Sequence, residues 1–318
     1  MLHLRVLCQA EQTDQVLELL HAEAGAAHLV VLRGASVAPP GDLVSADLAR
    51  ESVDGVLEAL CGLGVDHSGG ITLEELDTTV SDAADAAERA APGDGVDAVI
   101  WEELLARTGE EAQLSGTFLT FLTIACLLAS IGVVENSAIT IVGAMVVGPE
   151  FGPLAALALG LVGRRWDLVR RAGLALSVGF LIAMVVTAVF AGLGRAVGAI
   201  DAGALHHDNA VAFIYQIGVN SLLVALLAGA AGMLSITSGR AATLVGVFIS
   251  VTTVPAAGYA VLAAVLGEWS QCGGAVAQLF INMAGIVIAA ALLLLVRRVR
   301  RRSALGSTTL GSRPLSSG

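Results

Sequence analysis

The chain has 318 residues, of which 56% are hydrophobic, and a mean hydropathy of +0.81. This composition is too apolar for a soluble globular protein of that length. The charge is unevenly distributed, because residues 1–114 carry a net charge of −17 and residues 115–318 carry a net charge of +6. We therefore expect an acidic soluble part followed by a membrane-embedded part, and the acidic part argues against a nucleic-acid partner.

Residues 1–80 predict a small α+β domain. Weakly alternating or apolar runs favour strands, and two stretches with apolar residues at helical spacing, which begin near Asp14 and Ser52, favour helices. The resulting order βαββαβ is that of a ferredoxin-like domain. Such a module has a modest core, so we also expect it to pair with a copy of itself in a homo-oligomer. The four strands are expected at 2–8, 27–32, 42–49 and 71–76.

Residues 81–114 are expected to connect this domain to the membrane part. The first half of the stretch is polar and alanine-rich, which favours a linker. Residues 97–112 place apolar side chains at helical spacing among several glutamates, which predicts an amphipathic juxtamembrane helix. Its acidic face disfavours anionic lipid, so we expect it to couple the soluble domain to the membrane part rather than to anchor it.

Residues 115–296 contain six apolar segments that are each long enough to span about 30 Å of hydrocarbon. They predict a polytopic α-helical membrane domain with six transmembrane helices. A basic tail over residues 297–318 follows and is expected to be disordered. The six segments are 115–134, 138–162, 172–193, 213–235, 241–266 and 276–296.

The arginines predict the orientation of these segments. Four arginines follow the second segment between Arg164 and Arg171, Arg240 follows the fourth, and five follow the sixth. The other connections are poor in arginine. The positive-inside rule then places both termini in the cytoplasm, so we expect a multi-pass protein of the cell membrane whose N-terminal domain is cytoplasmic.

The segments repeat with a spacing of 102 residues. Adding 102 to the first three segments gives positions close to the last three, and Pro153 maps onto Pro255. Since each unit would cross the membrane three times, the second unit would be inverted relative to the first. Inverted 3+3 repeats with broken central helices are typical of transporters and channels.

The strongest candidate site is the run Gly148-Pro149-Glu150-Phe151-Gly152-Pro153 in the second segment. Two prolines there predict a helix break, and a carboxylate inside a membrane segment indicates function by default. The equivalent stretch in the fifth segment ends at Pro255 and offers hydroxyls, including those of Thr252 and Thr253. The alternative is a pair of ordinary proline kinks that neighbouring helices satisfy.

Three asparagines are further candidates for binding a solute or ion. Asn136 follows the first segment, and Asn220 and Asn282 lie inside the fourth and sixth. Membrane asparagines also hydrogen-bond between helices without any ligand, so both readings stay open. His206, His207 and Asp208 are adjacent, which is poor spacing for one metal ion. No metal site, cofactor or catalytic residue is predicted.

Several of these motifs resemble a known family. Glu135-Asn136-Ser137-Ala138, Gly143-Ala144-Met145, Gly148–Pro153 and Phe280-Ile281-Asn282-Met283 are similar to the bacterial hydrophobic membrane proteins grouped as domain of unknown function 389. The resemblance covers about residues 115–296. It implies a soluble module before a membrane core, but no activity. The chain departs from the family pattern at Glu150, where an apolar residue is more common, and at Pro255, where a proline pair is common.

Two functions remain in view. The first is a transporter or channel for a small solute or ion, with its site at the broken helices near Glu150 and Pro255 and with regulation by the cytoplasmic domain. The alternative is a membrane-embedded sensor or scaffold whose cytoplasmic domain binds an effector or partner without transport. An enzyme is not expected, because the chain lacks H-E-x-x-H, G-x-S-x-G and paired membrane aspartates.

Overall fold

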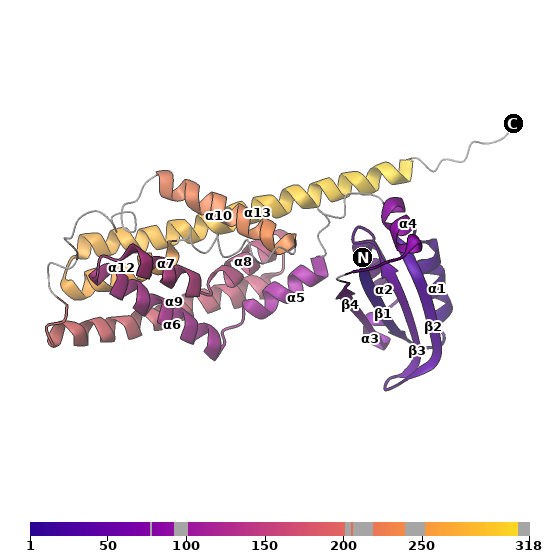
Figure 1. Cartoon of the computed structure of the whole chain (residues 1–318), viewed down its shortest axis with the longest axis horizontal. Coiled ribbons are helices and arrows are strands. Elements are labelled where there is room, and N and C mark those ends of the chain that lie inside the picture. The colour runs from indigo at the N-terminus through magenta and orange to yellow at the C-terminus, as the bar shows by residue number, and fades with distance from the viewer. Residues whose placement is uncertain (77, 92–100, 201–204, 206–218, 239–251, 311–318) are drawn as a thin grey trace. The chain divides into compact units, whose positions relative to one another are not determined.

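The computed structural model describes residues 1–76, 78–91, 101–200, 205, 219–238 and 252–310. The chain divides into two compact units (Figure 1). The first includes Met1–Leu104, which contains the β-sheet, and the division also assigns Ser303–Gly318 to it. The second covers Leu105–Arg302 and is helical. Each unit has its own interior.

The first unit is built on a four-stranded antiparallel sheet with the order β2-β3-β1-β4. Helices α1 and α2 connect the strands as predicted, and this is the arrangement of the split βαβ unit. The short helix α3 is an addition that the sequence pattern did not indicate. The bounds are β1 Leu2–Cys8, α1 Thr13–Ala22, β2 Ala26–Val37, β3 Pro40–Leu48, α2 Val53–Gly62, α3 Val65–Ser68 and β4 Gly70–Glu75.

The core of this unit lies between one face of the sheet and the apolar faces of α1 and α2. Alternate residues of β1, such as Leu4 and Val6, point into it because successive strand side chains face opposite sides. Leu20 of α1 and Leu60 of α2 cover them and are also fully buried. The predicted periodicities therefore correspond to one shared core.

The stretch expected to be a linker contains a helix, α4 (Asp82–Ala90). Ser81 caps this helix by accepting hydrogen bonds from the backbone N–H groups of Ala83 and Ala84. The small side chains of Ala84 and Ala87 are buried, and α4 packs against β2. An alanine-rich sequence can thus form a docked helix where larger side chains would not fit. Helix α5 (Trp101–Glu111) follows.

Besides the end of α5, the second unit contains seven helices within the described residues. Four of them are long and apolar enough to cross a membrane, namely α6, α9, most of α10, and α13 as far as Val299. The pair α7 and α8 passes the same test together, as a fifth span that is bent. The bounds are α6 Gly116–Val134, α7 Ala138–Val147, α8 Phe151–Gly163, α9 Trp166–Ala196, α10 Val219–Thr237, α12 Thr253–Leu266 and α13 Trp269–Leu310.

Five of the six predicted segments therefore correspond to spans or to a bent pair. For the fifth predicted segment, 241–266, the described part is α12, which has 14 residues. Its first half, with Ser250, lies outside the described residues. Six crossings and the inverted repeat thus stay predictions. Residues 297–310 of the tail differ from expectation, because α13 continues as a helix to Leu310, and residues 311–318 lie outside the described residues. Arginine and alanine favour the extension of a helix that is already formed.

Helix α12 forms the centre of the second unit. Every residue from Thr253 to Ala263 is buried, as expected for a helix that is apolar on all sides. Gly258 lets it approach α6 closely, because a Cβ atom at this position would lie 3.0 Å from both Ala129 Cβ and the Cys126 carbonyl oxygen. This packing fixes the start of α12 inside the bundle.

Candidate binding site at the broken helix

The predicted break in the second membrane segment is present. Helix α7 ends at Val147 and α8 begins at Phe151, and the two axes differ by 51°. Pro149 has no backbone N–H, so an unbroken helix could not use it as a donor. The three residues 148–150 connect the two helices, and the candidate site is centred on them.

Glu150 is the N-cap residue of α8 and is 4% exposed. Its Oε1 atom accepts a hydrogen bond of 2.6 Å from the hydroxyl of Thr253. Its Oε2 atom is buried and has no partner among the described residues. A Cβ atom at Gly148 would lie 2.3 Å from this Oε2 atom, so the carboxylate occupies the space that a side chain at position 148 would take.

The start of α12 meets the break. Thr252 is its N-cap, Thr253 contacts Glu150, and Pro255 is its third residue, just as Pro153 is the third residue of α8. Neither N-cap residue supplies a side-chain hydrogen bond to its own helix. The first N–H groups of a helix lack acceptors within it and carry partial positive charge. Two such helix starts therefore converge on one carboxylate.

A polar network extends the site to α10 and α13. Asn282 donates from Nδ2 to the Thr252 hydroxyl at 2.6 Å. Its Oδ1 accepts from Gln278 Nε2 at 3.0 Å and from the Ser221 hydroxyl at 3.2 Å, and Gln278 also donates to Ser221. Gln278 is fully buried, and its Oε1 atom has no partner in the described part of the chain. The site thus includes side chains from the starts of α8 and α12 and from α10 and α13.

A surface hollow of about 340 Å³ opens beside the break. Gly148, Pro149 and Gly152 line one side of it. Glu110 and Glu111, at the end of α5, line another. The approach to the broken helix is therefore acidic.

The predicted site residues are only partly brought together. The residues Gly148, Pro149, Glu150, Gly152, Pro153, Thr252, Thr253, Pro255 and Asn282 lie at the break or in its network. Asn220 is exposed and belongs to neither. Asn136 lies in the turn between α6 and α7, at the opposite end of α7 from the break, and has a φ of 50°. Its buried Oδ1 atom has no partner among the described residues.

Ser221 and Gln278 belong to the network but were not predicted from the sequence. Gln278 had a usable signal, since it precedes Asn282 by four residues, and residues four apart share one face of a helix. Ser221 had none, because serine is common inside membrane helices. Among the described residues, no group of three His, Cys, Asp or Glu side chains could hold a metal ion. His206, His207 and Asp208 lie outside those residues.

The apolar helices define a multi-pass membrane protein with an α+β domain at its N-terminus. A family model described as "Domain of unknown function (DUF389)" matches residues 145–288, which confirms the resemblance found in the sequence. The match includes Glu150 and Asn282, but it does not include Glu110 and Glu111. Neither a curated protein nor a solved structure matches the chain.

Proposed function

We propose that the membrane unit transports or conducts a small ion or solute, and that a cation binds at Glu150. The observation that carries this proposal is a buried carboxylate with one unpartnered oxygen, placed where two helix starts meet. A purely structural carboxylate would be expected to have partners for both oxygens, because a buried polar group without one is costly.

The energetic cost of a charge inside the membrane favours a ligand at Glu150. A charged side chain in the middle of a membrane helix costs about 2.5–3.5 kcal/mol on insertion scales. A single hydroxyl from Thr253 offsets part of this, and the described residues offer Glu150 no ion pair. A bound cation or proton would supply the missing partner.

The surroundings favour a positively charged ligand over an anion. When it is ionised, Glu150 has one carboxylate oxygen free to coordinate a cation. The free oxygen of Gln278 is a second acceptor in the same network. Glu110 and Glu111 raise the local concentration of cations at the hollow beside the break.

An inverted 3+3 repeat of six crossings fits this function. In such folds the two broken central helices meet at the binding site. Helices α8 and α12 begin 102 residues apart, and each carries proline as its third residue. With the orientation inferred from the arginines, both termini are cytoplasmic and the protein resides in the cell membrane. This proposal includes no catalytic chemistry.

The test is cation flux in liposomes that contain the purified full chain. The wild type is expected to carry a monovalent cation or protons down an imposed gradient. Glu150→Gln should reduce this flux at least roughly tenfold, because it removes a charged interaction of about 1.5–3 kcal/mol. Glu135→Gln is the matched control, since Glu135 is exposed in the turn after α6. Flux that Glu150→Gln leaves unchanged would contradict the role of the carboxylate.

A second function is a sensor or scaffold in which the N-terminal domain binds an effector or a second copy of itself. The observation that favours it is the separate core of the first unit. It predicts that a partner or effector binds the full chain while liposomes show no flux. Control of transport by this domain would combine the two functions.

A further inference from the structure

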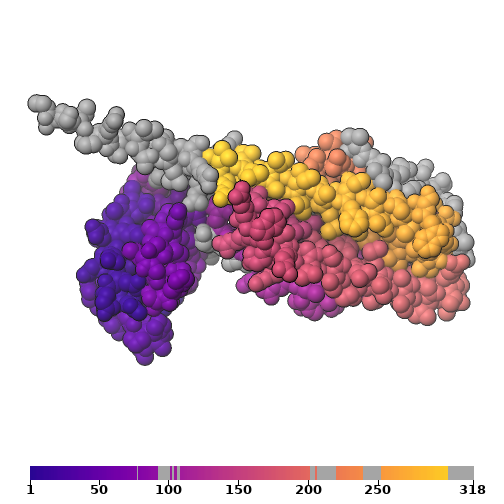
Figure 2. All heavy atoms as spheres, turned by 180° about the vertical axis from the view of Figure 1, so that it is seen from behind, coloured from indigo at the N-terminus to yellow at the C-terminus, as the bar shows by residue number. Residues whose placement is uncertain are grey.

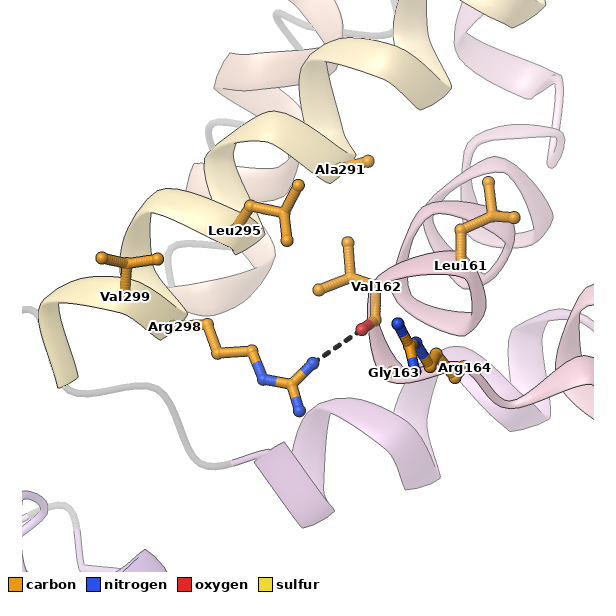
Figure 3. A pocket seen from close by; sticks show the side chains of 8 residues that line it. All are labelled: Leu161, Val162, Gly163, Arg164, Ala291, Leu295, Arg298 and Val299. Carbon is orange, nitrogen blue, oxygen red and sulfur yellow. Dashed lines mark hydrogen bonds between the residues drawn. The ribbon is translucent and has the colours of Figure 1, made fainter. Parts of the chain in front are cut away.

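A groove of about 600 Å³ lies between the end of α8 and α13, and it shares no residue with the site at Glu150 (Figure 3). Leu161 of α8 and Ala291 and Leu295 of α13 form its apolar walls. Arg164 and Arg298 lie at one end. The groove therefore has an apolar part and a basic part.

The two arginines are held differently. Arg298 donates from Nη1 to the carbonyl oxygen of Val162 at 2.7 Å, which satisfies one of the acceptors left over at the end of α8. Arg164 is the C-cap residue of α8, with a left-handed backbone and an exposed side chain. Figure 3 shows the two guanidinium groups on either side of the Val162 carbonyl. The hydrogen bond to Val162 holds the Arg298 guanidinium group at the mouth of the groove.

Both guanidinium groups keep hydrogen-bond donors for a ligand. A guanidinium has five N–H donors, and the bond to Val162 uses one of those of Arg298. Within the described part of the chain, neither arginine lies within ion-pairing distance of a carboxylate. Two positive charges that lack a counter-ion favour a phosphate, which arginine binds through paired hydrogen bonds.

The apolar walls distinguish a free phosphate ion from a phosphate that carries an acyl chain. Leu161 and Leu295 are 45% and 44% exposed, and Ala291 and Leu295 precede Arg298 by two turns and one turn on α13. In Figure 2, α13 forms a continuous outer surface of the helical unit, drawn from orange to yellow. A free phosphate ion would not use these walls. An acyl chain would.

We propose that this groove binds one anionic phospholipid. Its phosphate lies between Arg164 and Arg298, and one acyl chain runs along Leu161, Ala291 and Leu295. The positive-inside orientation places the arginine-rich connections in the cytoplasmic leaflet, where basic pockets between membrane helices bind anionic head groups. The bound lipid would join the end of α8, and so the broken span, to α13.

The test is native mass spectrometry of the purified full chain after addition of phosphatidylglycerol or phosphatidylcholine. The wild type is expected to retain one phosphatidylglycerol and to retain phosphatidylcholine more weakly. The double variant Arg164→Gln/Arg298→Gln should lower the retained phosphatidylglycerol by roughly tenfold or more, because each basic residue contributes about 1 kcal/mol. Arg170→Gln, which removes an exposed arginine of α9 outside the groove, should leave it unchanged.

Two further variants keep the test decisive if the double variant folds poorly. Arg164→Gln alone leaves the bond between Arg298 and Val162 in place and should still weaken phosphatidylglycerol retention. Ala291→Trp leaves both charges but fills the apolar part, and should also release the lipid. Equal retention of lipid by all of these variants overturns the proposal. So does displacement of the lipid by millimolar inorganic phosphate, which would identify a site for the free ion instead.

Discussion

Glu150 and Gly148 depend on each other. The carboxylate lies so close to Gly148 that a Cβ atom there would be 2.3 Å from Oε2 and 2.9 Å from a methyl group of Val254. Glycine at this position therefore does more than allow the helix to break. It leaves the space in which the carboxylate and the start of α12 meet.

Gly148→Ala is expected to displace the Glu150 carboxylate and to reduce cation flux in the same direction as Glu150→Gln. Overpacking of a buried site typically costs about 1–3 kcal/mol, so the thermal unfolding temperature in detergent should also fall. Gly143→Ala is the control, because a Cβ atom at Gly143 meets nothing within 4 Å. Full flux in Gly148→Ala would show that the position of the carboxylate is unimportant.

In the first unit, Asp47 links three elements. It binds His3 Nδ1 at 2.6 Å and His28 Nδ1 at 2.7 Å, and His28 Nε2 contacts the Ser81 hydroxyl before α4 at 2.8 Å. Burial raises the pKa of Asp47, but the hydrogen bonds from His3 and His28 outweigh it and hold this pKa below its ordinary value. The ionised form is thus the one that stabilises the fold.

The stability of the first unit should therefore depend on acid pH. Because the folded state lowers the pKa of Asp47, its contribution is complete above the unfolded value of about 3.9 and is lost as the pH falls through the folded value. The thermal unfolding temperature is expected to fall between pH 5 and pH 2. Asp47→Asn should make this fall less steep and should lower the free energy of unfolding by about 1–3 kcal/mol at neutral pH. If the unfolding temperature of Asp47→Asn falls as steeply with pH as that of the wild type, the acid sensitivity belongs to other carboxylates.

At the scale of elements, the two central helices share one design. Each has an N-cap residue whose side chain makes no capping hydrogen bond. Each also has proline as its third residue, where the backbone N–H has no partner within the helix and can be absent without cost. The first half of each helix is buried, so their starts can meet inside the bundle. Their position depends on close helix packing, for which Gly258 is the clearest example.

Gly258→Leu is expected to separate α12 from α6 and to lower the free energy of unfolding by about 1–3 kcal/mol or more. The control is Gly273→Leu on α13, where a Cβ atom meets nothing within 4 Å and the residue is exposed. Thermal unfolding in detergent compares the two. Equal unfolding temperatures would contradict the packing described for α12.

The sequence predicted the elements better than their contacts. The break near Glu150 was predictable because two prolines and two glycines within six residues do not fit an unbroken membrane helix. The partnership of Glu150 with Thr253, and of Asn282 with Thr252, was not, since hydropathy does not tell which helices are neighbours. Helix α4 was missed because its buried residues are alanines, whose weak hydrophobicity resembles that of a linker.

At the scale of the whole molecule, the chain combines a unit suited to water with a unit suited to lipid. The first has a core of leucine and valine side chains between its sheet and helices. The second exposes many large apolar side chains, such as Leu181 at 64% and Leu227 at 69%, which is expected only where lipid surrounds them. Each unit should therefore be able to fold in its own medium.

Residues 1–91 alone are expected to fold cooperatively in water. Leu60→Ala, which removes a fully buried side chain, should destabilise this fragment by about 2–5 kcal/mol. Val37→Ala, at a position that is 87% exposed, should change little. Urea unfolding followed by circular dichroism measures both. A fragment without a cooperative transition would mean that its fold needs the rest of the chain.

The most direct test of the binding site is a high-resolution cryo-electron microscopy map of the full chain in lipid nanodiscs with sodium or potassium present. Density for an ion or an ordered water molecule is expected within bonding distance of Glu150 Oε2, and this density should be lost in Glu150→Gln. Dry packing of apolar side chains against Oε2 in the wild type would contradict it.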